Sequence, residues 1–288
     1  MKWLRESRKI YPDELQLLDD VLARFYVNPP KRYHEESTEA NEGWDDTDHV
    51  FHKKITDLAY PDAKVLDVGC GPAMACPWFV KKKAHYTGVD LSREQLETNR
   101  RGFPDCDFLE MHWREIQCLG DVFDIVTSFF TLEHVVYPRE FLEASSRCVK
   151  PGGFMAVLCP DYLNRGFMPS QHFFGRKPGG IKAKIKKIQW IEALIEIVDR
   201  YYIYPGLIQE ARLMSGNDGA WLINLRPLCL ESKSWERDWD AVYMVGEDEV
   251  ANYIKNLGFK IIERGAKIRE ADSSGIYPEF CYIISQKI

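Results

Sequence analysis

The stretch Val65-Leu66-Asp67-Val68-Gly69-Cys70-Gly71-Pro72-Ala73 (residues 65–73) joins a short apolar run to a turn that contains two glycines. The apolar run is typical of a buried strand, and the two glycines allow the backbone to turn sharply and to approach a ligand closely. A helix is expected directly afterwards. Pro77 is compatible with it, because proline is tolerated in the first turn of a helix. The stretch therefore predicts a strand, a glycine turn and a helix in succession.

Four more apolar runs follow, each separated from the next by a helical segment. The five runs from Lys64 onwards read KVLDVG, HYTGVD, DFLEM, FDIVTSFF and GFMAVLCP. Alternating strands and helices predict a parallel sheet with helices on both faces. A helix over 247–257, ending at Gly258, precedes two further strands, FKIIERGAKI and FCYIISQKI, which could pair as an antiparallel hairpin at the sheet edge. The predicted fold class is α/β, with a Rossmann-like, seven-stranded, mostly parallel sheet.

The segments outside this pattern predict two additions to the core. Residues 1–60 hold apolar positions at helical spacing over 13–26 and again over about 45–60, which predicts a helical N-terminal cap. The alternation is lost in 163–240, which is long and aromatic and contains a predicted helix across KIQWIEALIEIVDRYY. We interpret 163–240 as a helical lid and substrate insertion. The core then comprises 61–162 and 241–288.

Composition narrows the class of protein. A net charge of −6 over 288 residues disfavours nucleic acid as a partner, because binding phosphates requires a basic surface. The eight cysteines contain no C-x-x-C pair and no zinc-like spacing, so we expect reduced thiols and no metal. The N-terminus is charged throughout, and no stretch approaches the length of a membrane span. A cytoplasmic protein is expected, and its oligomeric state is not predicted.

The second strand ends in Gly88-Val89-Asp90, which places a carboxylate beside the glycine turn. A carboxylate at this position can accept hydrogen bonds from both hydroxyls of a ribose. Ser92-Arg93-Glu94-Gln95 fits a capping box, so a helix begins soon after Asp90 and the acid stays at the strand tip. An adenosine-containing ligand at the carboxyl ends of the strands is therefore predicted.

Two adenosine cofactors are compatible with this arrangement. A dinucleotide fingerprint requires a third glycine where this chain has Met74, and no Tyr-x-x-x-Lys pair is recognisable near the expected helix. Both points disfavour a nicotinamide-dependent oxidoreductase, which remains an alternative.

A family resemblance favours an adenosine-containing cofactor other than a nicotinamide dinucleotide. The segments VLDVGCGP, GVDLS, FDIVTSFFTLEHV and CVKPGGFMAV resemble, in order, successive segments of class I S-adenosylmethionine-dependent methyltransferases of type 11/12. The resemblance spans about residues 60–160 and implies S-adenosylmethionine as the cofactor. Asp67, Gly69 and Gly71 would hold its methionine end, Asp90 its ribose, and Leu91 would flank the adenine. The other cofactor-binding candidates are Cys70, His112, Trp113, Ser128 and Phe129; His112 stands where the family usually has an acid.

The methyl acceptor is less well defined. We expect transfer to an oxygen, or secondarily a nitrogen, of a small metabolite such as a sugar or natural-product intermediate. His134 is the catalytic candidate, as a general base for a hydroxyl, with a cofactor-wall residue as the alternative. Tyr33, Asp161, Tyr162 and His172 are candidates for binding the acceptor.

Two further questions stay open at this stage. A methyltransferase-like subunit that binds cofactor without catalysis, and that mainly supports a partner, is an alternative to an enzyme. The basic run 176–187 lies inside an acidic chain. It fits a site for a phosphorylated or carboxylated substrate, contact with an anionic membrane, or a solvated helix face.

Overall fold

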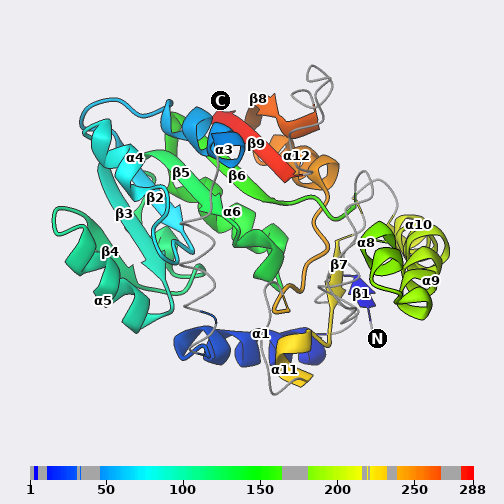
Figure 1. The fold of residues 1–288 in the computed structure, drawn as a ribbon. Helices are drawn as coiled ribbons and strands as arrows, with labels where there is room; N and C mark the ends of the chain where they lie inside the picture. The colour runs from blue at the N-terminus through cyan, green and yellow to red at the C-terminus, as the bar shows by residue number, and fades with distance from the viewer. Residues whose placement is uncertain are drawn as a thin grey trace.

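The computed structural model describes residues 3–5, 12–30, 33, 46–163, 181–215, 219, 221–231, 239–266 and 280–288 (Figure 1). Its strands are β1 (Trp3–Arg5), β2 (Lys64–Val68), β3 (His85–Asp90), β4 (Asp107–Glu110), β5 (Phe123–Phe129), β6 (Val149–Pro160), β7 (Leu222–Asn224), β8 (Phe259–Arg264) and β9 (Phe280–Lys287). Its α-helices are α1 (Pro12–Val27), α3 (Asp46–Thr56), α4 (Cys76–Lys81), α5 (Arg93–Gly102), α6 (Pro138–Cys148), α8 (Ile181–Lys186), α9 (Trp190–Val198), α10 (Tyr204–Ser215), α11 (Leu228–Glu231) and α12 (Glu247–Asn256). Short turns are η1 (Ile116–Leu119), η2 (Leu132–His134) and the π-helical η3 (Asp199–Ile203).

The central sheet has seven strands in the order β4-β3-β2-β5-β6-β9-β8. Neighbouring strands from β4 to β6 are parallel, whereas β9 runs antiparallel to both β6 and β8. The predicted seven-stranded, mostly parallel sheet is confirmed, and so is the antiparallel pair at its edge. Chain order reverses between β2 and β5, and ligands of open parallel sheets bind at such a point.

Helices cover both faces of the sheet, because alternate side chains of each strand point to opposite faces. One core joins Phe51 of α3, Phe79 of α4 and Leu96 of α5 to one face. The other joins Phe141 of α6 and Ile254 of α12 to the opposite face. The buried strand β5 therefore carries apolar side chains on both sides, as expected for the middle of a parallel sheet.

The N-terminal helix α1 lies across the carboxyl ends of the strands (Figure 1). Its Leu15, Leu18 and Leu22 are buried against the core, so the helical spacing read from the sequence reports a real apolar face. The ion pair between Asp19 and Arg114, which follows β4, ties the middle of α1 to the edge of the sheet. This part of the predicted cap therefore covers the strand tips.

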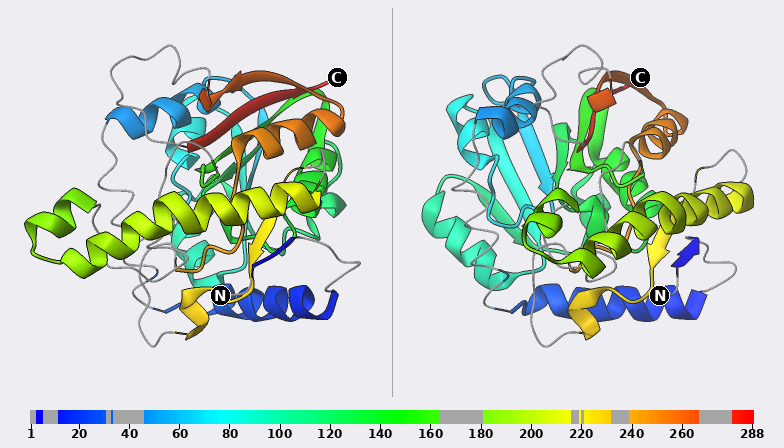
Figure 2. Two further views of the ribbon diagram at one scale, coloured as in Figure 1. Left: turned by 90° about the vertical axis from the view of Figure 1, so that its right-hand side faces the viewer. Right: turned by 45° about the vertical axis from the view of Figure 1, so that its right-hand side comes forward.

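The segment predicted as a lid contains α8, α9, η3 and α10, of which the last three run as one long rod (Figure 2). The helix predicted over 187–202 begins at Trp190, after a turn at 187–189, and continues through α10. Strand β7 of the same segment pairs with β1, which joins two regions that the sequence assigns to different domains. The lid role and the domain boundaries stay predictions. None of the described helices is both long enough and apolar enough to cross a membrane.

Candidate active site

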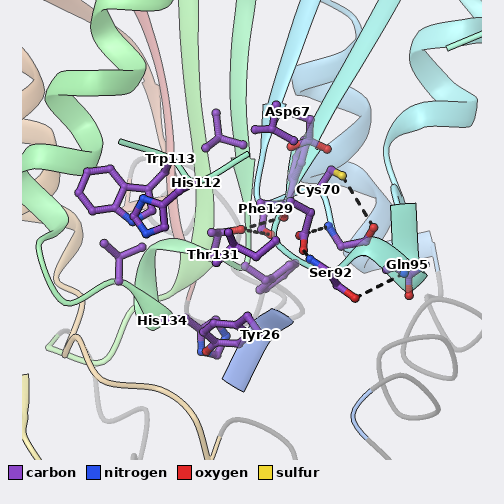
Figure 3. Close-up of a pocket in the computed structure, with 18 of the residues that line it drawn as sticks. Tyr26, Asp67, Cys70, Ser92, Gln95, His112, Trp113, Phe129, Thr131 and His134 are labelled. Carbon is purple, nitrogen blue, oxygen red and sulfur yellow. Dashed lines mark hydrogen bonds between the residues drawn. The ribbon is translucent and has the colours of Figure 1, made fainter. Parts of the chain in front are cut away.

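A cavity of about 240 Å³ lies at the carboxyl ends of β2, β3 and β5, under α1 (Figure 3). One edge is formed by the glycine turn after β2 and by the tip of β3. The other edge is formed by α1, by the turn after β5 and by Asp240. We call these the cofactor edge and the acceptor edge. The cavity is thus at the position predicted for an adenosine-containing ligand.

The glycine turn requires glycine for two different physical reasons. Gly69 has a φ of +74°, and a Cβ added there would lie 2.3 Å from Cγ2 of Thr131, whose hydroxyl donates a 3.1 Å hydrogen bond to the Gly69 carbonyl oxygen. Gly71 has a φ of +45°, and the space beside its Cα is open. The turn therefore packs tightly against Thr131 at Gly69 and presents bare backbone to the cavity at Gly71.

Asp90 is held at the tip of β3 by backbone donors. Its carboxylate accepts 2.9 Å hydrogen bonds from the backbone N–H groups of Gly71 and Ser92. The Asn99 side chain donates a 2.7 Å hydrogen bond to the Gly71 carbonyl oxygen, so helix α5 fixes the turn from its other side. Asp90 and the glycine turn are thus held together as one unit at the wall of the cavity.

Asp67 is buried at the end of β2 and is already well hydrogen-bonded. Tyr86 donates to it over 2.6 Å and Thr127 over 3.1 Å. Burial nevertheless raises the pKa of Asp67 to about 6, because the charged carboxylate is removed from water. Burial also raises the pKa of the Cys70 thiol well above its usual value, so Cys70 lines the cavity as a neutral, apolar group.

The far end of the cofactor edge is formed by Leu91, Met111, His112 and Trp113. His112 Nδ1 accepts a 3.1 Å hydrogen bond from the backbone N–H of Arg114, and burial lowers the pKa of the imidazole. The neutral ring therefore carries its proton on Nε2, where it can only donate. A hydrogen-bond donor here, in place of the usual acid, suits a ring nitrogen of adenine rather than its amino group.

At the acceptor edge, three side chains from distant segments meet (Figure 3 shows His134 and Tyr26). His134 Nδ1 lies 3.3 Å from Oδ2 of Asp240, and Tyr26 donates a 2.8 Å hydrogen bond to the same oxygen. His134 Nε2 lies 3.8 Å from Oε1 of Glu133. Burial and the neighbouring Asp240 raise the pKa of Tyr26 well above its usual value, so Tyr26 stays protonated and acts as a donor.

The backbone explains how Asp240 reaches His134. The carbonyl oxygen of Glu133 accepts hydrogen bonds from the N–H groups of Val242 and Tyr243, at 2.8 and 2.9 Å. The Val242 carbonyl in turn accepts from Asn224 at the end of β7. The segment that returns from the insertion is therefore fixed beside the turn after β5, and Asp240, which is 1% exposed, is brought to the imidazole.

Most of the predicted site residues line this cavity. They are Tyr33, Asp67, Gly69, Cys70, Gly71, Asp90, Leu91, His112, Trp113, Phe129 and His134. Phe129 also stacks on His52 of α3, with 4.6 Å between ring centroids, so His52 covers one face of its ring. A contact of Phe129 with the cofactor would have to use the remaining part of the ring.

Three predicted residues do not line the cavity. Ser128 is buried on the face of β5 opposite to Phe129, because side chains alternate along a strand. Asp161 is buried beyond the end of β6, where its Oδ1 accepts a 3.3 Å hydrogen bond from the Glu247 N–H at the start of α12. Tyr162 is buried in the core next to it. The sequence predicts Asp161 and Tyr162 just after a strand end, but it does not show that α12 packs against Asp161 there. His172 lies outside the described residues.

The sequence interpretation missed several lining residues, above all Tyr26 and Asp240. Tyr26 lies in α1, which the sequence predicts as a helix, but the sequence does not indicate which part of the fold this helix packs against. Asp240 lies in an irregular segment without a motif. Thr131 had a signal, since it directly follows the fourth predicted strand. Among the described residues no three His, Cys, Asp or Glu side chains gather as a metal site, and the absence of a metal stays a prediction.

Comparison with known proteins adds an independent line of observation. The model of a family described as a methyltransferase domain matches residues 66–157. A ubiquinone biosynthesis O-methyltransferase of Erwinia tasmaniensis is 34% identical over 185 residues, which cover 56% of this chain and 73% of that protein. Another from Maricaulis maris is 35% identical over 110 residues, covering 36% of this chain and 43% of the relative. This chain spans about half or less of the length of several such relatives.

Two solved structures share the fold. An S-adenosylmethionine-dependent methyltransferase from Mesorhizobium loti has a TM-score of 0.53 at 15% identity, covering 86% of this chain and all of that one. A putative S-adenosylmethionine-dependent methyltransferase from Listeria monocytogenes has a TM-score of 0.50 at 13% identity, covering 83% and 98%. At these identities the likeness concerns the arrangement of the chain.

The cofactor edge suits S-adenosylmethionine. The open backbone at Gly71 leaves room for the cofactor where a side chain would fill it, and the Asp90 carboxylate lies beside it in the cavity wall. The nicotinamide alternative has no third glycine in this turn. Motif order, fold and sequence identity agree: the chain belongs to the class I S-adenosylmethionine-dependent methyltransferase family, and its cofactor is S-adenosylmethionine.

Proposed function

We propose that the protein methylates a hydroxyl oxygen of a small molecule whose body is apolar or aromatic, with His134 as the general base. The observation that carries this proposal is the chain of contacts from Tyr26 through Asp240 to His134 at the acceptor edge. Methyl transfer from a sulfonium is an in-line displacement, so positioning supplies much of the rate. A hydroxyl acceptor also has to give up its proton to a base for efficient transfer. A free-base amine does not, because it attacks through its lone pair and loses a proton only afterwards.

His134 has the surroundings of a base. His134 Nδ1 lies 3.3 Å from Oδ2 of Asp240, so the carboxylate favours a proton on that nitrogen and leaves Nε2 to take the proton of the acceptor hydroxyl. Two carboxylates, of Asp240 and Glu133, lie within 4 Å of the ring nitrogens and stabilise the imidazolium that then forms. The Tyr26 hydroxyl holds the Asp240 carboxylate in position. Asp240 and Tyr26 are thus positioning residues, and His134 is the catalytic residue.

The walls of the acceptor edge support the chemical class of the acceptor. Helix α1 contributes Leu22, Ala23 and Tyr26, and the turn after β5 contributes Val135. An apolar wall binds an aromatic or alkyl body, whereas a sugar needs polar partners around its ring. This favours a phenolic or otherwise apolar acceptor over the sugar that the sequence also allowed. The relatives named as ubiquinone biosynthesis O-methyltransferases support oxygen as the accepting atom.

When bound, S-adenosylmethionine supplies the electrophilic methyl group. The chain's own residues perform the rest: Asp90 and the turn at Gly71 orient the cofactor, and α1 excludes water from the acceptor edge. His134 receives the acceptor proton at Nε2 while Asp240 balances the new positive charge. The proton leaves for solvent after transfer.

The test is an acceptor panel with matched members: catechols and phenols with apolar substituents, anilines of the same shape, and sugars. Purified protein is incubated with S-adenosylmethionine, release of S-adenosylhomocysteine is measured, and the methylated atom is identified by NMR. We expect turnover of phenolic members and O-methyl products. Faster turnover of the anilines would contradict the proposal. So would micromolar cofactor binding without turnover of any phenolic member, which is the result expected of a non-catalytic partner subunit.

A further inference from the structure

The rod formed by α9 and η3 carries apolar side chains on its outer surface. The outward-facing residues, which we call the arm stripe, are Ile188, Trp190, Ile191, Leu194, Tyr201 and Tyr202. Each is between 60 and 77% exposed. Ile191, Leu194 and Tyr201 of the stripe lie on one side of the rod together with Val198, which is 41% exposed, because positions 191, 194, 198 and 201 follow helical spacing.

The opposite side of the same rod is buried and contains two acidic side chains besides Ala193. Glu196 and Asp199 point inward, and Glu196 forms a buried ion pair with Lys184 of α8. A surface helix of a soluble protein normally shows the reverse pattern. Helix α12 does so here: it buries Val250 and Ile254 against the sheet and exposes Asp248. The inverted arrangement of α9 indicates that the arm stripe faces an apolar environment when the protein works.

Positive charge accompanies the arm stripe. Lys182, Lys186 and Lys187 are exposed at and just after α8, and none of them takes part in an ion pair with another described residue. The chain as a whole carries −6, so this cluster is a local exception. Apolar residues with tryptophan and tyrosine next to unpaired lysines are the combination that binds the surface of an anionic bilayer.

The shape of the arm also favours a flat partner. Figure 2 shows the turn between α8 and α9 projecting beyond the rest of the molecule. We propose that the arm of residues 181–203 docks on an anionic lipid surface, with the arm stripe in the headgroup region and the lysines on the lipid phosphates.

The experiment is flotation of the full chain with vesicles of phosphatidylcholine, alone or mixed with phosphatidylglycerol. We expect binding to the mixed vesicles only, weakening with added salt. Leu194→Glu should abolish it, whereas Leu17→Glu, which changes an equally exposed leucine on α1, should leave it intact. Each lysine near the surface contributes about fivefold to binding, so Lys186→Glu with Lys187→Glu should weaken it by more than about 25-fold.

S-adenosylhomocysteine titration of every variant keeps this result separate from the proposed function. Unchanged affinity shows that the variant is folded and that its cofactor edge is intact. Absence of binding to the mixed vesicles, or binding that survives Leu194→Glu, would overturn the proposal. A dimer in solution that Leu194→Glu dissociates, without lipid binding, would also overturn it and assign the arm stripe to a second copy.

Discussion

The cofactor edge and the acceptor edge of one cavity are built in opposite ways. At the cofactor edge, Gly69, Gly71 and Asp90 lie at two adjacent strand ends, and the backbone N–H groups of the two glycines donate to the Val89 carbonyl and the Asp90 carboxylate. At the acceptor edge, Tyr26, His134 and Asp240 come from three distant segments and meet through side chains. The first edge is a property of the core sheet, and the second depends on α1 and on the return from the insertion. The acceptor edge can therefore change without loss of the cofactor.

The largest difference between the edges is expected from His134→Ala. Loss of a general base should lower kcat by about 10²- to 10⁴-fold, while S-adenosylhomocysteine affinity stays within about twofold, because the imidazole acts on the acceptor. Turnover of a phenolic acceptor and calorimetric titration measure the two effects. His85→Ala, an exposed histidine far from the cavity, is the control. An equal fall in affinity would place His134 in the cofactor wall.

Asp90→Ala should show the opposite behaviour. A hydrogen bond from a ligand hydroxyl to a carboxylate contributes about 1.5–3 kcal/mol, so losing one should weaken binding of S-adenosylhomocysteine by roughly 10- to 150-fold. With saturating cofactor, kcat should recover in large part. Asp57→Ala changes an exposed acid of the same type and should have no effect. Unchanged affinity of the Asp90 variant would show that the ribose lies elsewhere.

Asp240→Asn tests how the acceptor edge is held together. The amide keeps the shape of the carboxylate but carries no charge beside the imidazole, so kcat should fall by about tenfold. The acidic limb of the kcat–pH profile should move to lower pH, because the imidazolium loses a neighbouring negative charge. Tyr26→Phe should give a smaller fall of about two- to fivefold. Asp248→Asn is the surface control. A lower kcat with an unshifted profile would indicate a purely structural role for Asp240.

The smallest effect concerns stability and lies at the cofactor edge. The pKa of Asp67 is about 6 in the folded protein against 3.8 when unperturbed, so folding favours the protonated form. Its contribution to stability is complete below pH 3.8 and is lost as pH rises through 6. Between pH 5 and 7 the free energy of unfolding should fall by about 1 kcal/mol from this group. Urea denaturation of the wild type and Asp67→Asn at both values measures it.

Asp67→Asn should remove this fall, whereas Asp62→Asn, an exposed control, should keep it. The same fall in both variants would show that another group is responsible for the pH dependence. A rise in stability between pH 5 and 7 that depends on Asp67 would contradict the direction of its pKa shift.

The core fold was predictable because its signals are local. Strand runs, the glycine turn after β2, the cap at Ser92 and the acid at Asp90 each occupy a few consecutive residues, and backbone geometry places their ends at one edge of the sheet. Ser128 and Tyr162 show the limit of such reasoning. Both follow or end a predicted strand, yet each lies on a face that the core occupies.

The sequence by itself therefore determined the sheet, the cofactor edge and the position of His134 at a strand tip, since short-range geometry settles all three. Only the tertiary structure decided that α1 covers the cavity, that Asp240 reaches His134, and that α9 turns its apolar side outward. Each of these depends on which surfaces meet after the chain has folded back over long distances. Periodicity gives a helix its two faces, but packing alone decides which face is buried.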